Sequence, residues 1–356
     1  MLPHSVMTPS IRYVLCATVL LSACSSSDSE VPAEAASLPA TEATITGAGS
    51  TFAAPIIESW IEAYRNVEGS VDISYSSVGS GEGINRFSAA TVDLGATDAP
   101  LSEEELVEVH ASRQLPLTAG MIGITYNMEG LEEPLKLSRE AYAGIFLGTV
   151  ERWDDPLIVA NNPGADLPAK LIQLVARSDS SGTTHSFTEH LSAVSPEWAA
   201  GPGAGKRISW LGGTMEAAGN EGVAGHIKMT LGSIGYVNSG FAERLGLPLA
   251  ILENRDGQFV APTIETGQAA MASAGSDKVD EIAAAMIDPT GADSYPITTY
   301  TWFLLRDSYG SDDKTAAVKD LVEWTLSDGQ DYAESLHYIP LPEAISSAAL
   351  ANLENH

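Results

Sequence analysis

Apolar and polar positions follow two different periods along most of the chain. Residues 71–75 alternate between apolar and polar side chains, which predicts a strand with one buried face. Residues 56–64 carry apolar side chains at helical spacing, directly after Pro55, which suits the first turn of a helix. Because such strands and helices alternate along the chain, the sequence predicts an α/β protein.

The same two periods predict further elements. Strands are expected at 92–96, 117–126, 171–176 and 300–305. Helices are expected after the turn at 79–83 through Phe87, at 141–147, after the turn at 180–184 through His190, and over most of 315–336. The length of 356 residues exceeds what one hydrophobic core normally serves, so we expect two domains.

Turns rich in Gly, Ser and Thr precede three of the predicted helices. They lie at residues 47–52, 79–83 and 180–184. The start of a helix presents free main-chain N–H groups and a partial positive charge, and Ser and Thr add hydroxyl donors. Helix capping by itself explains one such turn. Three turns together with the nearby Arg177 favour an anion-binding site.

The charge of the chain limits its partners. Lys and Arg number 18 and Asp and Glu 47, which gives a formal net charge of −29 at pH 7. This acidity argues against a nucleic-acid partner, since nucleic-acid binding normally needs a basic surface. Distant surface charges matter little inside a cleft, because the Debye length is about 8 Å at physiological salt. An anion would therefore have to be held by local donors.

The first 23 residues have the pattern of a secretory signal peptide. Arg12 precedes an apolar run at 13–21, and the run ends in Leu21-Ser22-Ala23-Cys24. The alternative is a single transmembrane anchor, but the run is too short to span about 30 Å of hydrocarbon. Residues 24–42 are rich in Ser, Ala, Glu, Pro and Thr and are expected to form a flexible tether.

The two cysteines are Cys16 and Cys24. Because Cys16 lies in the segment expected to be removed, the mature domain should contain no disulfide and no cysteine-based metal site. The Leu-Ser-Ala-Cys ending resembles the bacterial lipobox. This resemblance implies that Cys24 becomes the lipid-carrying first residue of the mature chain.

Four motifs, taken in their order along the chain, are the most specific feature of the sequence. They are Gly47-Ala48-Gly49-Ser50-Thr51-Phe52, Val78-Gly79-Ser80-Gly81, Val92-Asp93-Leu94-Gly95-Ala96-Thr97-Asp98-Ala99-Pro100 and Arg177-Ser178-Asp179-Ser180-Ser181-Gly182-Thr183. Supporting stretches lie at 148–155, 219–224 and 296–299. Over nearly all of residues 44–345, the chain resembles the phosphate-binding component (PstS type) of phosphate ABC importers.

This resemblance implies a type II periplasmic-binding-protein fold, in which two α/β lobes enclose a ligand cleft. Lobe I is expected to contain residues 43–118 and 296–356, and lobe II residues 119–295. The implied role is not enzymatic and needs no cofactor. It is the capture of inorganic phosphate outside the cytoplasmic membrane and its delivery to the permease and ATPase subunits of an importer. The protein is expected to be a monomer held at the membrane by its lipid anchor.

The ligand residues of that family fall on matching positions here. They are Thr51, Phe52, Ser80, Asp98, Arg177, Ser181, Gly182 and Thr183. By this resemblance, main-chain amides and Ser and Thr hydroxyls would donate to the anion from both lobes. Arg177 would add a charge-assisted contact, and Asp179 would hold the Arg177 guanidinium in place without touching the ligand.

Asp98 is the most informative of these residues. A carboxylate in an anion site is costly unless the ligand brings a hydrogen to it. Hydrogen phosphate carries such a hydrogen, whereas sulfate does not, so an ionised Asp98 would accept from phosphate and repel sulfate. Many relatives have a second Ser and a Gly where this chain has Gly81 and Glu82. We expect Glu82 to face solvent, because a carboxylate pointing into the cleft would weaken anion binding.

Two other functions remain open at the level of sequence. One is the binding of another tetrahedral oxyanion such as sulfate or molybdate, against which Asp98 argues. The other is a secreted enzyme that handles phosphate. The chain has no Gly-x-Ser-x-Gly elbow, Arg207 stands where a phosphate loop needs Ser or Thr, and His185 and His190 have no third metal ligand at suitable spacing.

Overall fold

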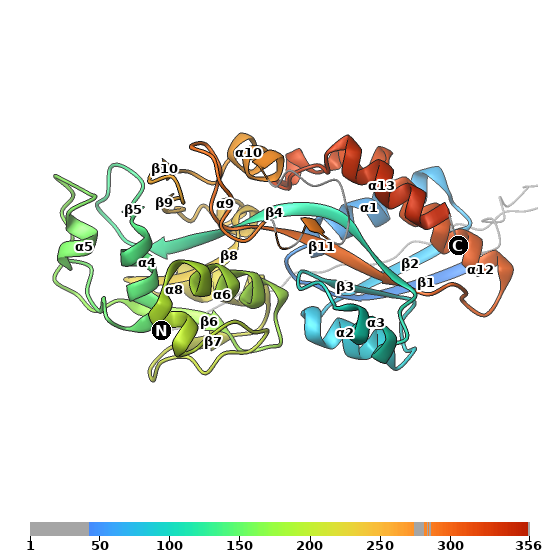
Figure 1. Ribbon diagram of the computed structural model, residues 1–356, viewed down its shortest axis with the longest axis horizontal. Coiled ribbons are helices and arrows are strands. Elements are labelled where there is room, and N and C mark those ends of the chain that lie inside the picture. Colours follow the sequence, from blue (N-terminus) through green and yellow to red (C-terminus); the bar gives the residue numbers. More distant parts are fainter. Residues whose placement is uncertain (1–42, 274–280, 283, 285, 355–356) are drawn as a thin grey trace, which may run out of the picture. The chain divides into compact units, whose positions relative to one another are not determined.

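The computed structural model describes residues 43–273, 281–282, 284 and 286–354 (Figure 1). The expected signal peptide (1–23), tether (24–42) and lipid attachment at Cys24 lie outside these residues. Within the described ranges, none of the helices has the length and apolar character needed to cross a bilayer.

A mixed sheet of eight strands forms the centre of the fold, in the order β2-β1-β3-β11-β4-β8-β6-β7. The strands are β1 (Ala43–Gly49), β2 (Val71–Ser77), β3 (Leu94–Thr97), β4 (Arg113–Asn127), β6 (Gln173–Arg177), β7 (Met215–Ala217), β8 (Ser233–Asn238) and β11 (Thr298–Leu305). A smaller sheet has the order β10-β9-β5, with β5 (Lys136–Leu137), β9 (Ile251–Glu253) and β10 (Phe259–Val260). The strands expected from the sequence are present, with ends shifted by a few residues.

The long strand β4 connects the two ends of the main sheet. Its first part pairs antiparallel with β11, and from Ile122 onward it pairs antiparallel with β8 instead. Figure 1 shows β4 and β11 side by side, with β1 to β3 at one end and β6 to β8 at the other. The lobe boundary expected between residues 118 and 119 falls inside β4, and the one expected at 295/296 lies just before β11. The division into two lobes stays a prediction.

Helices pack on the sheet through the apolar faces that the sequence indicates. Within the described residues, the α-helices are α1 (Ala54–Val67), α2 (Ser80–Ser88), α3 (Glu103–Glu108), α4 (Arg139–Leu147), α5 (Pro156–Val159), α6 (Gly182–Val194), α7 (Pro196–Ala200), α8 (Gly219–Met229), α9 (Ser239–Arg244), α10 (Ile264–Ser273), α12 (Asp312–Leu326) and α13 (Glu343–Glu354). In α1, for example, Ile56, Ile57, Trp60, Ile61 and Tyr64 are buried as their spacing predicts.

The helix predicted over most of 315–336 is present, but its α-helical part ends before residue 336. The α-helix α12 stops at Leu326, and two short 3₁₀-helices follow, η1 (Asp328–Tyr332) and η2 (Glu334–Leu336). Here tertiary hydrogen bonds override the local helical pattern. The Gly329 carbonyl accepts from Trp60 Nε1 at 2.6 Å, and Gln330 Nε2 donates to the Leu117 carbonyl at 2.9 Å. These contacts fix the chain against α1 and β4 instead of continuing the helix.

Candidate anion-binding site

Four helix starts come together at one buried place. Gly81, in the first turn of α2, donates its amide to the Ser180 carbonyl just before α6, at 2.9 Å. Asn220, in the first turn of α8, donates its amide to Thr51 Oγ1 just before α1, at 3.1 Å. The sequence predicts three of these helix starts as anion-binding turns, whereas the start of α8 is an addition from the structure. Each start contributes a partial positive charge, so their combination favours an anion.

All eight residues predicted to bind ligand are buried. Ser80 Oγ accepts from the Asp98 amide at 3.2 Å, whereas Ser181 caps α6, with its Oγ accepting from the Thr184 amide at 3.0 Å and its own amide donating to the Lys206 carbonyl at 2.9 Å. The main-chain amides of Thr51, Phe52, Gly182 and Thr183 donate to no acceptor within the described part of the chain. Buried amides without a partner are rare in folded proteins, because each one loses its hydrogen bonds to water. These amides are therefore available as donors at the helix starts.

The first turn is fixed by a close approach between strands and by hydrogen bonds to its carbonyls. Gly49 ends β1 with a φ of 144° and lies so close to β3 that a methyl group there would stand 2.0 Å from the Ala96 carbonyl oxygen. After this crossing, Tyr75 donates its hydroxyl to the Ser50 carbonyl at 2.9 Å, and Tyr338 donates to the Phe52 carbonyl at 2.5 Å. The partly buried Tyr75 and the buried Tyr338 thus hold the carbonyls of the turn, while its amides remain available.

Asp98 places a buried carboxylate beside these donors. The Ser50 hydroxyl donates to Asp98 Oδ1 at 2.5 Å, and the Thr301 hydroxyl donates to the same oxygen at 2.8 Å. Burial raises the pKa of Asp98 to about 6, against the lowering effects of Ser50, Thr301 and the nearby Arg177 charge. Because both hydroxyls reach Oδ1, the other carboxylate oxygen keeps capacity to accept a hydrogen.

Arg177 is held by Asp179, as predicted. Its Nε donates to Asp179 Oδ1 at 2.7 Å and its Nη2 to Oδ2 at 2.5 Å, a bidentate pair. Burial acts to raise the pKa of Asp179, but the hydrogen bonds and charge of Arg177 outweigh it, so this pKa is lowered. Nη1 of Arg177 donates to Thr183 Oγ1 at 3.3 Å. A guanidinium has five N–H donors, so two remain for a ligand.

Three residues of the site were not singled out from the sequence. Ser50 and Thr301 orient the Asp98 carboxylate, and Asn220 contacts Thr51 and Thr183. Ser50 and Asn220 lie in the motifs quoted above, whereas Thr301 comes from β11, far along the chain. A run of Thr residues in an apolar strand is a weak signal for such a role, since Thr is common in strands.

Glu82 faces away from the site, as predicted. Its side chain is 47% exposed and accepts from Arg86 Nε at 2.8 Å, one helical turn later on α2. This exposed pairing keeps the extra carboxylate out of the buried group of donors.

Comparisons with known proteins identify the family of this chain. Residues 34–329 match the family model of the PBP superfamily domain. The phosphate-binding protein PstS of Pasteurella multocida is 39% identical over 303 residues, which covers 85% of this chain and 87% of the relative. PstS of Haemophilus influenzae is 38% identical over 304 residues, covering 85% and 90%. The chain belongs to the PstS family.

The solved structures confirm the periplasmic-binding-protein fold predicted for this PstS-family chain. A high-affinity periplasmic phosphate-binding protein, PfluDING bound with phosphate, aligns with a TM-score of 0.68 over 86% of this chain and 93% of its own. Its sequence identity is 21%, so this likeness establishes the fold alone.

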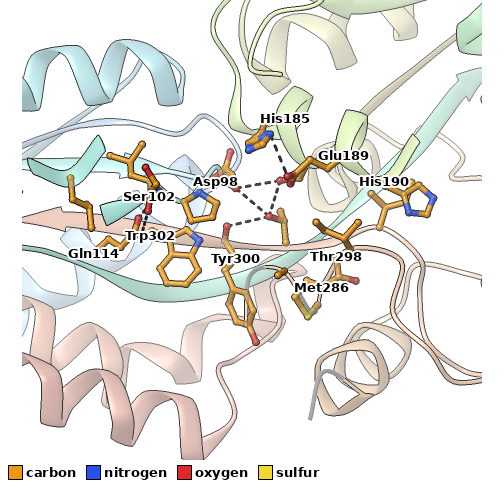
Figure 2. A pocket seen from close by; sticks show the side chains of 18 of the residues that line it. Asp98, Ser102, Gln114, His185, Glu189, His190, Met286, Thr298, Tyr300 and Trp302 are labelled. Atoms are coloured by element: carbon orange, nitrogen blue, oxygen red, sulfur yellow. Dashed lines mark hydrogen bonds and ion pairs between the residues drawn. The ribbon is translucent and has the colours of Figure 1, made fainter. Parts of the chain in front are cut away.

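A cavity of about 420 Å³ opens beside Asp98 in this PstS-family protein (Figure 2). His185, Glu189 and His190 reach it from α6, and Tyr300 and Trp302 from β11. Of the predicted ligand residues, Asp98 alone lines it, so we distinguish it from the group of anion donors.

The histidines of this cavity do not add positive charge to the site at neutral pH. Burial lowers the pKa of His185 and of His190 to about 4, so both are neutral. Among the described residues, no group of three or more His, Cys, Asp or Glu side chains could hold a metal ion. Arg177 and the helix starts therefore supply the positive potential.

Proposed function

We propose that this protein captures inorganic phosphate outside the cytoplasmic membrane and delivers it to an ABC importer. Its role is binding, without catalysis, as in the PstS family to which it belongs. The observation that supports the choice of ligand is Asp98, a buried carboxylate that lies among main-chain amides, hydroxyls and Arg177.

Phosphate is the anion that suits both kinds of group. The free amides of Thr51, Phe52, Gly182 and Thr183 donate to its oxygens, and the two unused N–H groups of Arg177 add a charge-assisted contact. Ionised Asp98 accepts the P–O–H hydrogen. Sulfate would place an oxygen without a hydrogen against that carboxylate, which leaves two acceptors facing each other.

Binding from both lobes gives a reason for closure. Contacts such as Gly81 to Ser180 and Asn220 to Thr51 join residues that we assign to lobe I with residues that we assign to lobe II. Lobes that hinge about β4 and β11 would make these contacts only when closed over the anion. Closure removes the anion from water, and the many donors offset that cost.

The remaining parts of the proposal concern partners and location. The closed, loaded protein would dock on the permease of an importer whose ATPase subunits lie in the cytoplasm. A lipid on Cys24 and the tether at 24–42 would keep the protein at the membrane as a monomer. The name PstS of the relatives and the signal-peptide pattern at 1–23 support this assignment.

Titration calorimetry at pH 7.5 with phosphate and with sulfate tests this function. The protein should bind phosphate in preference to sulfate, and Asp98→Asn should lose most of that preference. Asp93→Asn is the matched control. Asp93 directly precedes β3, but its carboxylate forms an ion pair with Lys314 at 2.8 Å and is not among the predicted ligand residues. Equal binding of both anions by the unmodified protein would contradict the proposal, and so would hydrolysis of p-nitrophenyl phosphate.

A further inference from the structure

Asn220 connects two hydroxyls of the anion site. It is the second residue of α8 and is completely buried. Its side-chain Nδ2 donates to Thr51 Oγ1 at 2.9 Å and to Thr183 Oγ1 at 3.3 Å. Its main-chain amide donates to Thr51 Oγ1 as well, at 3.1 Å. One asparagine thus binds hydroxyls from the starts of α1 and α6.

The orientation of the Asn220 amide is fixed by a main-chain partner. Asn238 N donates to Asn220 Oδ1 at 2.8 Å. An amide N–H can donate only to the oxygen, so this contact identifies which atom is Oδ1 and which is Nδ2. The NH₂ group of Asn220 must therefore face the two threonines as a donor.

This orientation determines what the threonine hydroxyls can do. Thr51 Oγ1 accepts from both Asn220 nitrogens, which uses its two lone pairs. Thr183 Oγ1 accepts from Asn220 Nδ2 and from Arg177 Nη1, each at 3.3 Å. Neither hydroxyl donates to another residue of the described chain, so the hydrogen of each is free for a ligand.

We propose that Asn220 is a positioning residue that commits the Thr51 and Thr183 hydroxyls to donate to the bound anion. This inference rests on the proposed function, and it explains how hydroxyls, which can donate or accept, act only as donors here. A hydroxyl free to rotate would turn a lone pair toward phosphate part of the time, so the loss of Asn220 would weaken binding without removing any group that touches the ligand.

The first experiment measures phosphate affinity by calorimetry for Asn220→Ala. We expect about a 10- to 100-fold weaker affinity, the range expected when hydrogen bonds to a charged group are disturbed. Asn254→Ala is the matched control, because Asn254 is equally buried and its Nδ2 donates to the carbonyls of Gly291, Ala292 and Ser294. The control should lower the unfolding temperature and leave phosphate affinity unchanged.

A double-mutant cycle with Thr51→Val separates positioning from general support of the fold. If Asn220 acts through the Thr51 hydroxyl, then removing Asn220 from a protein that already lacks this hydroxyl should cost clearly less affinity. If the double variant loses phosphate affinity by the product of the two single losses, the two residues act independently and the inference is contradicted. If Asn220→Ala does not fold, Asn220→Asp enters the same cycle, since it keeps the side-chain shape but turns the donor into an acceptor.

The outcomes also distinguish this inference from the function on which it rests. If the unmodified protein does not bind phosphate, both the proposed function and the role of Asn220 are overturned. If it binds phosphate and Asn220→Ala binds equally well, the role of Asn220 alone is overturned.

Discussion

Gly182 at the start of α6 lies directly against Asp98. A methyl group at Gly182 would stand 2.8 Å from both Cβ and the amide nitrogen of Asp98, and 2.5 Å from Ser80 Oγ. Such distances are far below ordinary contact, so a side chain there would push the start of α6 away from Asp98 and Ser80. The absence of a side chain at Gly182 is what lets the donors of α6 approach the Asp98 carboxylate.

Gly182→Ala should therefore weaken phosphate binding at least about tenfold, because the displaced helix start cannot place its amides correctly. Calorimetry with phosphate measures this loss. Gly225→Ala is the control, since Gly225 lies within α8 and a methyl group there meets nothing within 4 Å. This control should bind phosphate normally and be up to about 1 kcal/mol more stable. Normal affinity in Gly182→Ala would show that α6 and Asp98 do not act together.

The raised pKa of Asp98 makes anion selectivity depend on pH. Above its pKa of about 6, Asp98 is ionised and repels sulfate, and below this pKa the protonated carboxyl can donate to sulfate. Sulfate affinity should therefore rise about tenfold per unit as the pH falls from 8 to 6, and should level off below. Calorimetry with sulfate across this range tests it, and Asp98→Asn should show no such rise. A flat profile in the unmodified protein would contradict the role of Asp98.

The same pKa predicts how stability changes with pH. The folded pKa of Asp98, about 6, lies above its usual value of 3.8, so its contribution to stability is full at low pH and is lost as the pH rises through 6. At pH 8 and without phosphate, Asp98→Asn should raise the free energy of unfolding by up to about 3 kcal/mol. Urea unfolding measures this gain, which should shrink toward zero near pH 4. A gain that is equal at both pH values would need another explanation.

Removing Asp179 should leave the Arg177 guanidinium buried and without its bidentate partner. We expect Asp179→Asn to lower the free energy of unfolding by about 3 kcal/mol and to weaken phosphate binding at least tenfold. Arg152 and Asp154 form a matched pair with the same spacing, and their side chains are 46% and 36% exposed. Asp154→Asn should change stability by no more than about 1 kcal/mol. Urea unfolding and calorimetry on both variants check these expectations, and similar effects in the two would rule out a special role for Asp179.

Much of the fold was predictable because it follows from local patterns. Alternation at 71–75 and helical spacing at 56–64 give β2 and α1, since burial of one face is a property of each segment by itself. The end of α12 was not predictable in this way. It is determined by contacts of Gly329 and Gln330 with α1 and β4, which the local sequence does not contain.

The sequence by itself determined the types of donor and acceptor at the site. Turns that open helices at 47–52, 79–83 and 180–184 carry free amides wherever they lie, and a carboxylate and a guanidinium keep their chemistry in any fold. The order of the four motifs along the sequence also identified the family.

Only the tertiary structure decided how these groups act on one another. Thr301 reaches Asp98, and Asn220 reaches Thr51, because the crossing of β11 and the start of α8 bring distant segments within hydrogen-bond distance. Hydrogen bonds and pKa values depend on separations of a few ångströms and on exclusion of water. These quantities arise when the chain packs, so no stretch of sequence contains them.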